Sequence, residues 1–237
     1  MDNIIENIRS ELSRNADEKT RISGERFFRE SVKLYGLKSA MVTSIAKEYF
    51  KKIPVRNKEN IFLLCEELWK SGFLEEAGIA CIWSYSVRKE YVTGDFRVFE
   101  KWVNKYVTNW ATCDTLCNHT VGSFIEMYPT FLAELKNWAR SLNLWVRRAS
   151  AVSLIVPARK GKFLEDILEI ADILHADRED MVQKGYGWML KAASEAHLQE
   201  IYKYVISKKA TMPRTSLRYA IEKMPPDLRA KAMEKNK

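Results

Sequence analysis

The sequence predicts an all-α fold, a right-handed superhelix built from about six stacked helix pairs, which is an α-solenoid with a concave basic face. Three observations lead to this expectation. Glycine (9) and proline (6) are scarce in the 237 residues. Apolar residues recur with helical spacing from one end of the chain to the other. Predicted helix starts recur at a nearly constant interval along the chain.

The expected helices follow from apolar stripes taken in chain order. The first stripe contains Phe27, Phe28, Val32 and Tyr35. The second contains the residues 61, 64, 65, 68 and 69, and Gly72 is expected to end it. The third contains the residues 96, 99, 103 and 106, with Asp95 as the expected N-cap. Further helices are expected near 111–127, 131–141, 144–155, 163–175, 178–193, 195–207, 214–223 and 226–235.

Prolines support these boundaries. Pro129, Pro157, Pro213 and the pair Pro225–Pro226 fall between the expected helices or in their first turns, where a missing N–H costs little. No stretch alternates between apolar and polar residues convincingly, so no sheet is expected.

A structural repeat connects the expected helices. The second helix of each pair is expected to begin near Leu37, Phe73, Trp110, Trp145 and Val182, at steps of 36, 37, 35 and 37 residues. This period is slightly shorter than the usual HEAT or armadillo unit. The inner wall of such a solenoid is made by the second helices, and we expect residues 1–237 to form a single HEAT-like domain.

The charge is positive and unevenly distributed. Lys and Arg total 39 against 31 Asp and Glu, a net charge of +8. Residues 141–162 contain five cations and no acid, and residues 201–237 contain ten cations and three acids. This balance favours an anionic partner.

The four cysteines, at positions 65, 81, 113 and 117, lie within apolar helical patterns. We interpret them as reduced thiols in the core of a cytoplasmic protein, and no second pair completes a metal site beside Cys113 and Cys117. No signal peptide and no membrane-spanning segment is expected.

The repeat register predicts a chemical site on the inner wall. Trp110 and Asp114 are one turn apart and face the same way. Arg148 occupies nearly the same depth in the next second helix, and Trp188 and Lys191 lie one turn further along in the one after. We expect these residues to converge on one concavity.

Three segments resemble the AlkD-type DNA glycosylase family. They are Thr108–Asp114 (TNWATCD), Asn143–Ala149 (NLWVRRA) and Val182–Lys191 (VQKGYGWMLK), and they occur in the family's order and at nearly its spacing. The first resembles the stretch with the family's essential aspartate. The second carries the family arginine, and the third carries a second tryptophan.

The resemblance implies a HEAT-like solenoid that hydrolyses the N-glycosidic bond of cationic alkylated purines, such as N3-methyladenine and N7-methylguanine, in double-stranded DNA. It implies no metal and no organic cofactor. Asp114 would stabilise the oxocarbenium character of the deoxyribose, as a nearby carboxylate can. Arg148 would bind a phosphate, while Trp110, Trp188 and Phe27 would surround the damaged nucleotide. A monomer is expected, associated with the nucleoid in a prokaryote.

Several positions depart from the family pattern. Phe27 stands where the family has a tyrosine, and Lys191 stands where it has an arginine. The segment Pro157–Lys162 also differs and is interpreted as a basic finger, with Arg159, Lys160 and Lys162, together with Arg147, against the DNA backbone. These departures keep a second interpretation open, a catalytically inactive member that binds branched or distorted DNA.

Common structural roles compete with the functional ones. Most tryptophans in amphipathic helices pack in the core, and Trp69, Trp83, Trp102 and Trp138 are assigned there. Arg147 and Arg148 could equally form an exposed face or an ion pair. A helical-repeat scaffold for proteins is a third possible class, and the acid-free basic segments argue against it.

Overall fold

The structure is a computed structural model, and it describes residues 4–234. These residues form helices joined by short connections, with no strand among them and one isolated bridge between Lys33 and Phe73. The chain divides into two compact units, Met1–Leu116 (unit 1) and Cys117–Lys237 (unit 2), each described separately below. Within the described residues, no helix is both long and apolar enough to cross a membrane.

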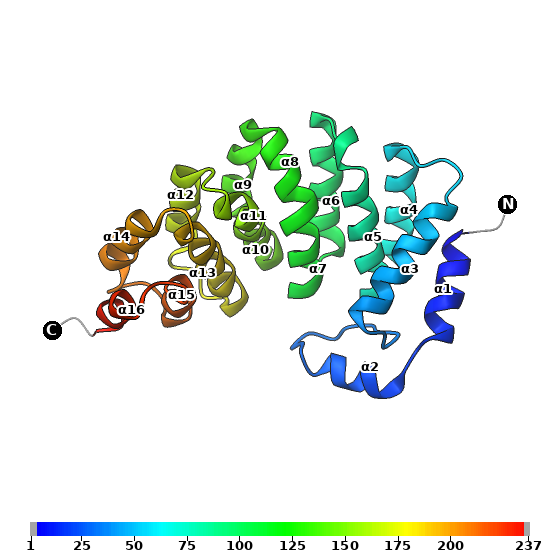
Figure 1. Cartoon of the computed structure of the whole chain (residues 1–237), viewed down its shortest axis with the longest axis horizontal. Coiled ribbons are helices and arrows are strands. Elements are labelled where there is room, and N and C mark those ends of the chain that lie inside the picture. Colours follow the sequence, from blue (N-terminus) through cyan, green and yellow to red (C-terminus); the bar gives the residue numbers. More distant parts are fainter. Residues whose placement is uncertain (1–3, 235–237) are drawn as a thin grey trace. The chain divides into compact units, whose positions relative to one another are not determined.

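Unit 1 contains seven α-helices and two short 3-10 turns in its described part (Figure 1). Helix α5 packs against α3, α4 and α7, and α1 packs against α3 and α4. The elements are α1 (Ile4–Arg14), α2 (Glu18–Glu25), α3 (Ser39–Lys52), α4 (Lys58–Lys70), α5 (Leu74–Ser86), η1 (Arg88–Glu90), η2 (Thr93–Asp95), α6 (Phe96–Tyr106) and α7 (Trp110–Thr115).

A π-helical segment, η3 (Leu116–Val121), contains the boundary between the two units. In unit 2, α13 is the central helix and packs against α10, α11, α12, α14 and α15. The elements are α8 (Gly122–Met127), η4 (Pro129–Phe131), α9 (Leu132–Trp138), α10 (Leu144–Val152), α11 (Ile155–Arg159), α12 (Leu164–Leu174), α13 (Asp180–Ser194), α14 (Leu198–Lys208), α15 (Arg214–Ala220) and α16 (Pro226–Met233).

The predicted helix starts are confirmed. The second helices α3, α5, α7, α10 and α13 begin at residues 39, 74, 110, 144 and 180, within two residues of the expected positions. The core tryptophans are also confirmed, since Trp69, Trp83, Trp102 and Trp138 are all buried. The all-helical prediction is therefore correct, and the stacked pairs are consistent with an α-solenoid.

One expected helix is absent. Phe27, Phe28, Val32 and Tyr35 do not form a helical stripe, because α2 ends at Glu25 and residues 26–38 form a non-helical connection. Long-range contacts set its course, including the hydrogen bond that the Leu74 backbone N–H donates to the Lys33 carbonyl (2.9 Å). The local apolar spacing was therefore misleading here.

Two boundary predictions are confirmed in position. Asp95 is the N-cap residue of α6, although its side chain makes no cap, because its buried carboxylate accepts from the Val92 N–H (2.7 Å) and pairs with Lys58 (3.0 Å). Pro157 lies in the first turn of α11, a short helix that the sequence did not predict. Arg159 is helical too, so the segment is not an extended basic finger.

Candidate functional site

Helix α7 positions Trp110 and Asp114. The buried Asn109 caps the helix, since its side-chain oxygen accepts from the Thr112 backbone N–H (3.0 Å). This cap fixes Trp110 at the first helical position, as asparagine caps commonly do. Asp114 follows one turn later on the same face, and both side chains are half-buried. The predicted pairing of an indole and a carboxylate on one helix face is therefore present.

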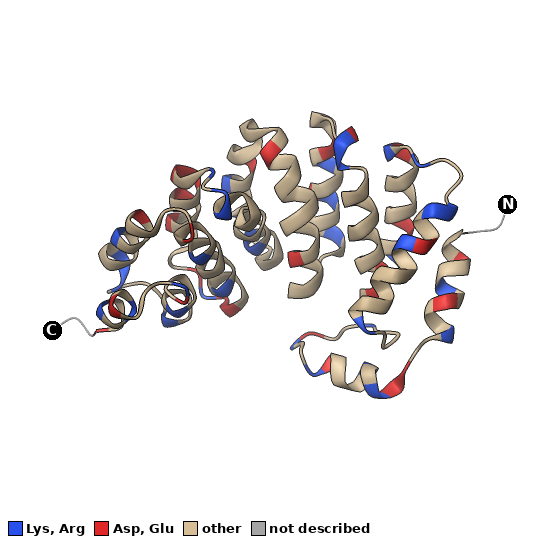
Figure 2. Cartoon of the chain, viewed as in Figure 1, with Lys and Arg blue, Asp and Glu red and all other residues tan. Residues whose placement is uncertain are grey.

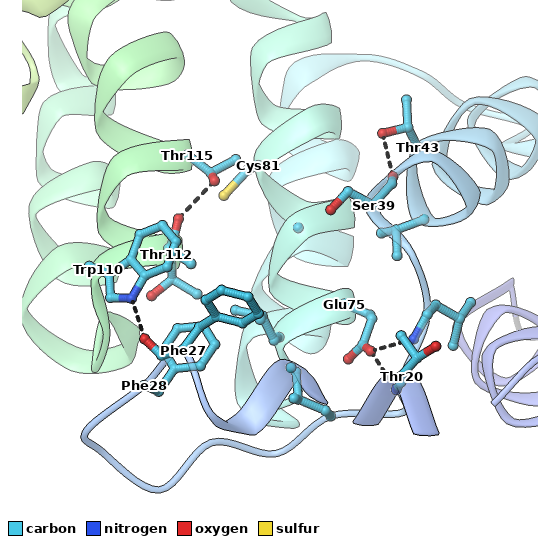
Figure 3. A pocket seen from close by; sticks show the side chains of 18 of the residues that line it. Thr20, Phe27, Phe28, Ser39, Thr43, Glu75, Cys81, Trp110, Thr112 and Thr115 are labelled. Carbon is cyan, nitrogen blue, oxygen red and sulfur yellow. Dashed lines mark hydrogen bonds between the residues drawn. The ribbon is translucent and has the colours of Figure 1, made fainter. Parts of the chain in front are cut away.

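The connection 26–38 holds the indole of Trp110. The Trp110 Nε1–H donates to the Phe27 carbonyl (3.3 Å), and the Phe28 ring stacks on the indole at 5.4 Å and 18° between planes (Figure 3). The Phe27 side chain itself is 72% exposed. Sequence reasoning selected Phe27, because it stands where the related family has a tyrosine, and missed the adjacent Phe28.

A cavity of about 370 Å³ lies between α2, the connection, α3, α5 and α7 (Figure 3). Phe27, Phe28 and Trp110 contribute aromatic rings to its lining, and Glu75 contributes a carboxylate. Threonines 20, 43, 112 and 115 also line it. This combination of aromatic faces and a few polar groups is typical of sites for small ligands or ligand fragments.

Two glutamates of α5 fix the wall of this cavity. Glu75 accepts hydrogen bonds from the backbone N–H groups of Tyr35, Gly36 and Leu37 (2.8–3.1 Å). Glu76 accepts from the Tyr35 hydroxyl (2.9 Å), and burial together with this bond raises the pKa of that phenol. The connection is therefore a preorganised wall despite its lack of helix.

In unit 2, Arg148 is a buried residue of α10. It is only 5% exposed, and its guanidinium donates to the Met181 backbone carbonyl on α13. Gly185 makes room for it, because a Cβ there would lie 3.3 Å from the Arg148 Cγ. The sequence predicted a phosphate-binding arginine at this position, whereas the structure gives this guanidinium an internal partner.

Arg147 links two connections of unit 2. Its Nε donates to Asp177 (2.6 Å), and its Nη1 donates to the carbonyls of Ser141 (2.9 Å) and Leu142 (3.0 Å). These contacts join the end of the α9–α10 connection to the connection before α13. They favour a structural role for Arg147 over its expected contact with the DNA backbone.

Trp188 and Lys191 lie three residues apart on α13. Trp188 is half-buried. The Lys191 ammonium pairs with Glu222 (3.0 Å) and lies 5.6 Å from the centre of the Tyr219 ring on α15. The backbones of α13 and α15 lie close together at Gly187. A Cβ added to this residue would lie only 2.9 Å from the Ser216 carbonyl oxygen.

The family model for DNA alkylation repair enzymes matches residues 8–224. The chain belongs to this family. A solved structure described as a predicted DNA alkylation repair enzyme from Enterococcus faecalis superimposes with a TM-score of 0.78 at 15% identity, covering 90% of this chain and 98% of that one. At this identity the likeness shows the fold alone. No curated protein matches the chain significantly in sequence.

The expected backbone-binding cations of this family member have carboxylate partners. Lys160 and Lys162 both pair with Glu126 (2.8 and 3.1 Å), and Arg159 lies 3.5 Å from Glu195. Burial alone would raise the pKa of Glu126, but the hydrogen bonds from the two lysines hold it below its usual value. Basic and acidic residues are interspersed along the helices of unit 2 (Figure 2).

The structure thus groups the family's motif residues by unit. Phe27, Trp110 and Asp114 belong to unit 1, while Arg148 and Trp188 belong to unit 2. Their convergence on a single trough stays a prediction. The four cysteines are buried and form no disulfide, and Cys81 lies in the lining of the cavity.

Proposed function

We propose that this protein hydrolyses the N-glycosidic bond of cationic N3- and N7-alkylated purines in double-stranded DNA. The observation that carries the proposal is on α7, where Asp114 follows Trp110 by one turn and the indole is held by Phe27 and Phe28 beside a cavity. Family membership supports a role in repair of alkylated DNA. The aromatic faces suit a positively charged base.

The proposed chemistry requires little acid catalysis. Alkylation at N3 or N7 makes the purine a cation, so it leaves as a neutral base when it takes both electrons of the bond to C1′. Positive charge then develops on the deoxyribose, and the carboxylate of Asp114 stabilises it. A water molecule forms the new bond to C1′ and loses a proton to Asp114 or to solvent. Trp110 offers an aromatic face to the nucleotide, with Phe27 beside it.

A base-release assay on DNA that contains N7-methylguanine tests this proposal. We expect the wild-type protein to release the methylated base and Asp114→Asn to release it about 100-fold more slowly or worse. The substitution keeps the side-chain shape, so DNA affinity should change little. Release by Asp114→Asn at the wild-type rate would remove Asp114 from the mechanism, and no release by the wild type would reject the activity.

A second candidate function is binding of branched or distorted DNA without catalysis. The specific observation behind it is that Arg148 and Lys191, which were expected to face DNA, have protein partners in Met181 and Glu222. Phe27 also lacks the hydroxyl of the family tyrosine. Binding to four-way and to linear duplex DNA separates the two functions, since only the second predicts preference for the four-way form without base release.

A further inference from the structure

Most of the described cations at the C-terminal end of unit 2 have no partner. Residues 201–237 contain ten Lys and Arg residues against three Asp and Glu. In the described part of this range, residues 201–234, only Lys208 pairs with a carboxylate, that of Asp172 (2.8 Å), and Lys209 donates to two backbone carbonyls. The side chains without a hydrogen bond or ion pair to any described residue are Lys203, Arg214, Arg218, Lys223, Arg229 and Lys231. Their positive charge is available to an anionic partner.

Two of these cations line one cleft, of about 620 Å³, between α15 and α16. Arg218 comes from α15 and Arg229 from α16, and both residues are exposed (Figure 2). The apolar part of the lining consists of Ile221, Pro226, Ala230 and Met233. Two guanidinium groups beside an apolar surface complement an anion that carries an apolar portion.

The one acid among the described residues that line this cleft is Glu222, and its charge is offset by a lysine. The Lys191 ammonium lies 3.0 Å from the Glu222 carboxylate, and the Lys191 side chain is only 15% exposed. The same ammonium lies beside the Tyr219 ring, 5.6 Å from its centre. Because Lys191 balances Glu222, the two arginines determine the net charge of the cleft, which is positive.

The repeat register distinguishes Arg218 from the other cations of unit 2. Helix α15 begins at residue 214, 34 residues after α13 begins at residue 180, so α15 continues the series of second helices. Arg148, Lys184 and Arg218 are the fifth residues of α10, α13 and α15, and equivalent positions of a repeat form a row. Arg148 donates to the Met181 carbonyl and Lys184 pairs with Asp180 (2.7 Å). Of this row, Arg218 can bind a phosphate without giving up a partner among the described residues.

We infer that this cleft binds the sugar-phosphate backbone of DNA, with Arg218 and Arg229 on a phosphate, an inference that rests on DNA as the substrate of the proposed function. A guanidinium group donates two parallel hydrogen bonds to phosphate oxygens, and the apolar lining suits the carbon face of a deoxyribose. Such a contact fixes the position of the duplex and carries no sequence information. Lys191 acts indirectly, because it prevents Glu222 from repelling the phosphate.

The first experiment measures the affinity for linear duplex DNA by fluorescence anisotropy at several salt concentrations. The double substitution Arg218→Gln and Arg229→Gln should weaken binding about tenfold or more, and it should make the slope of log affinity against log salt less steep by about 1–2. The matched control is Arg178→Gln with Lys203→Gln, which removes the same charge from two exposed residues of unit 2 outside the cleft. We expect the control to weaken binding less than about threefold. An equal loss in the control overturns the inference.

A second variant adds a negative charge to the cleft and keeps both arginines. Ala230 is exposed, lines the cleft and lies within α16, so Ala230→Glu introduces a carboxylate at a position where a helix accepts glutamate well. We expect Ala230→Glu to weaken DNA binding about tenfold. Thermal unfolding verifies that each variant folds. Unchanged affinity in Ala230→Glu or in the double arginine variant overturns the inference.

The role of Lys191 is tested by a double-mutant cycle with Glu222 in the same binding assay. Lys191→Met should weaken DNA binding, because it leaves the Glu222 carboxylate without its counter-charge beside the arginines. Adding Glu222→Gln to Lys191→Met should restore the wild-type affinity, since it removes the repelling charge. If the double variant binds DNA as weakly as Lys191→Met, Lys191 contacts the DNA directly and its indirect role is overturned.

The base-release assay on N7-methylguanine DNA separates this inference from the proposed function. Base release by the wild type, together with undiminished DNA affinity in the double arginine variant, would overturn the cleft as a DNA site while the proposed activity stands. Loss of affinity in that variant, with no base release by the wild type, would reject the activity and keep the cleft as a site for the DNA backbone.

Discussion

At the scale of single residues, the wall of the cavity requires a glycine at position 36. Its φ is +93°, and an added Cβ would lie 2.3 Å from the Asp17 carbonyl oxygen. Only glycine adopts this backbone region readily, and the close approach excludes a methyl group in addition. Gly36 also donates its N–H to Glu75 (2.8 Å). The connection 26–38 therefore depends on this residue for its path.

We expect Gly36→Ala to destabilise the protein by about 1–3 kcal/mol, because it combines backbone strain with a clash. Urea denaturation measures the change. Gly94→Ala is the control, with an expected effect within about 1 kcal/mol, since its added Cβ meets nothing within 4 Å. Equal stability of Gly36→Ala and the wild type would mean that the connection has another path of similar energy.

The sequence predicted which site residues share a helix face, but it did not predict which residues contact each other across the fold. Asp114 and Trp110 were placed on one helix face because helical spacing determines which side chains point the same way. The partner of a side chain is not encoded locally. The stacking of Phe28 on Trp110 and the bond from Arg148 to the Met181 carbonyl join residues far apart in sequence, and no local pattern reveals them.

At the scale of helices, Glu66 joins α4 to α6. Its carboxylate accepts from the Trp102 indole (2.7 Å) and the Tyr106 hydroxyl (2.5 Å), and it pairs with Lys101 (2.6 Å). Burial alone would raise the pKa of Glu66, but hydrogen bonds from Lys101, Tyr106 and Trp102 outweigh it and hold the pKa below its usual value. The carboxylate therefore stabilises the contact between these helices when it is ionised.

The lowered pKa predicts a pH-dependent loss of stability in Glu66→Gln. Because the folded pKa lies below the unfolded one, the stabilisation by Glu66 is complete above about pH 5 and is lost as the pH falls through the folded pKa. We expect Glu66→Gln to cost about 1–3 kcal/mol at neutral pH, with a smaller difference from the wild type in acid. Urea denaturation at a series of pH values measures this difference.

The neighbouring residue provides the control for this prediction. Glu67 is exposed and pairs with the exposed Lys70 (2.5 Å), so Glu67→Gln should change the free energy of unfolding by less than about 0.5 kcal/mol. A pH-independent difference between Glu66→Gln and the wild type would show that the carboxylate's charge contributes nothing to the contact between α4 and α6.

Whole helices were easier to predict than the connections between them. Starts such as Trp110 and Leu144 could be found because apolar periodicity is a local signal and the repeat interval is nearly constant. Residues 26–38 were assigned a helix for the same reason, since their apolar spacing looks helical. Their real path follows from hydrogen bonds to Glu75 and Glu76, about 40 residues away.

At the scale of the whole molecule, the net charge of +8 does not tell which cations lie beside an acid in the fold. The segment 141–162 has no acid in its sequence, yet Lys160 and Lys162 pair with Glu126 from outside it. Such exposed ion pairs are weak, so a DNA phosphate can take the place of the carboxylate. The segment 141–162 therefore remains a candidate DNA-binding surface, and Glu126 is expected to lower its affinity for DNA.

Because Glu126 and DNA phosphates compete for the same two lysines, substitution of the lysines and substitution of Glu126 should have opposite effects on DNA binding. The double substitution Lys160→Gln and Lys162→Gln should weaken binding. It should also make the slope of log affinity against log salt less steep by about 1–2, because fewer counterions are released. Glu126→Gln should tighten binding, since both lysines lose their internal partner. Fluorescence anisotropy with duplex DNA at several salt concentrations measures both. The control is Lys51→Gln with Lys52→Gln in unit 1, which removes the same charge from α3. If this pair lowers the salt slope as much as the other, the binding reflects the net charge of the chain rather than a surface at Lys160 and Lys162.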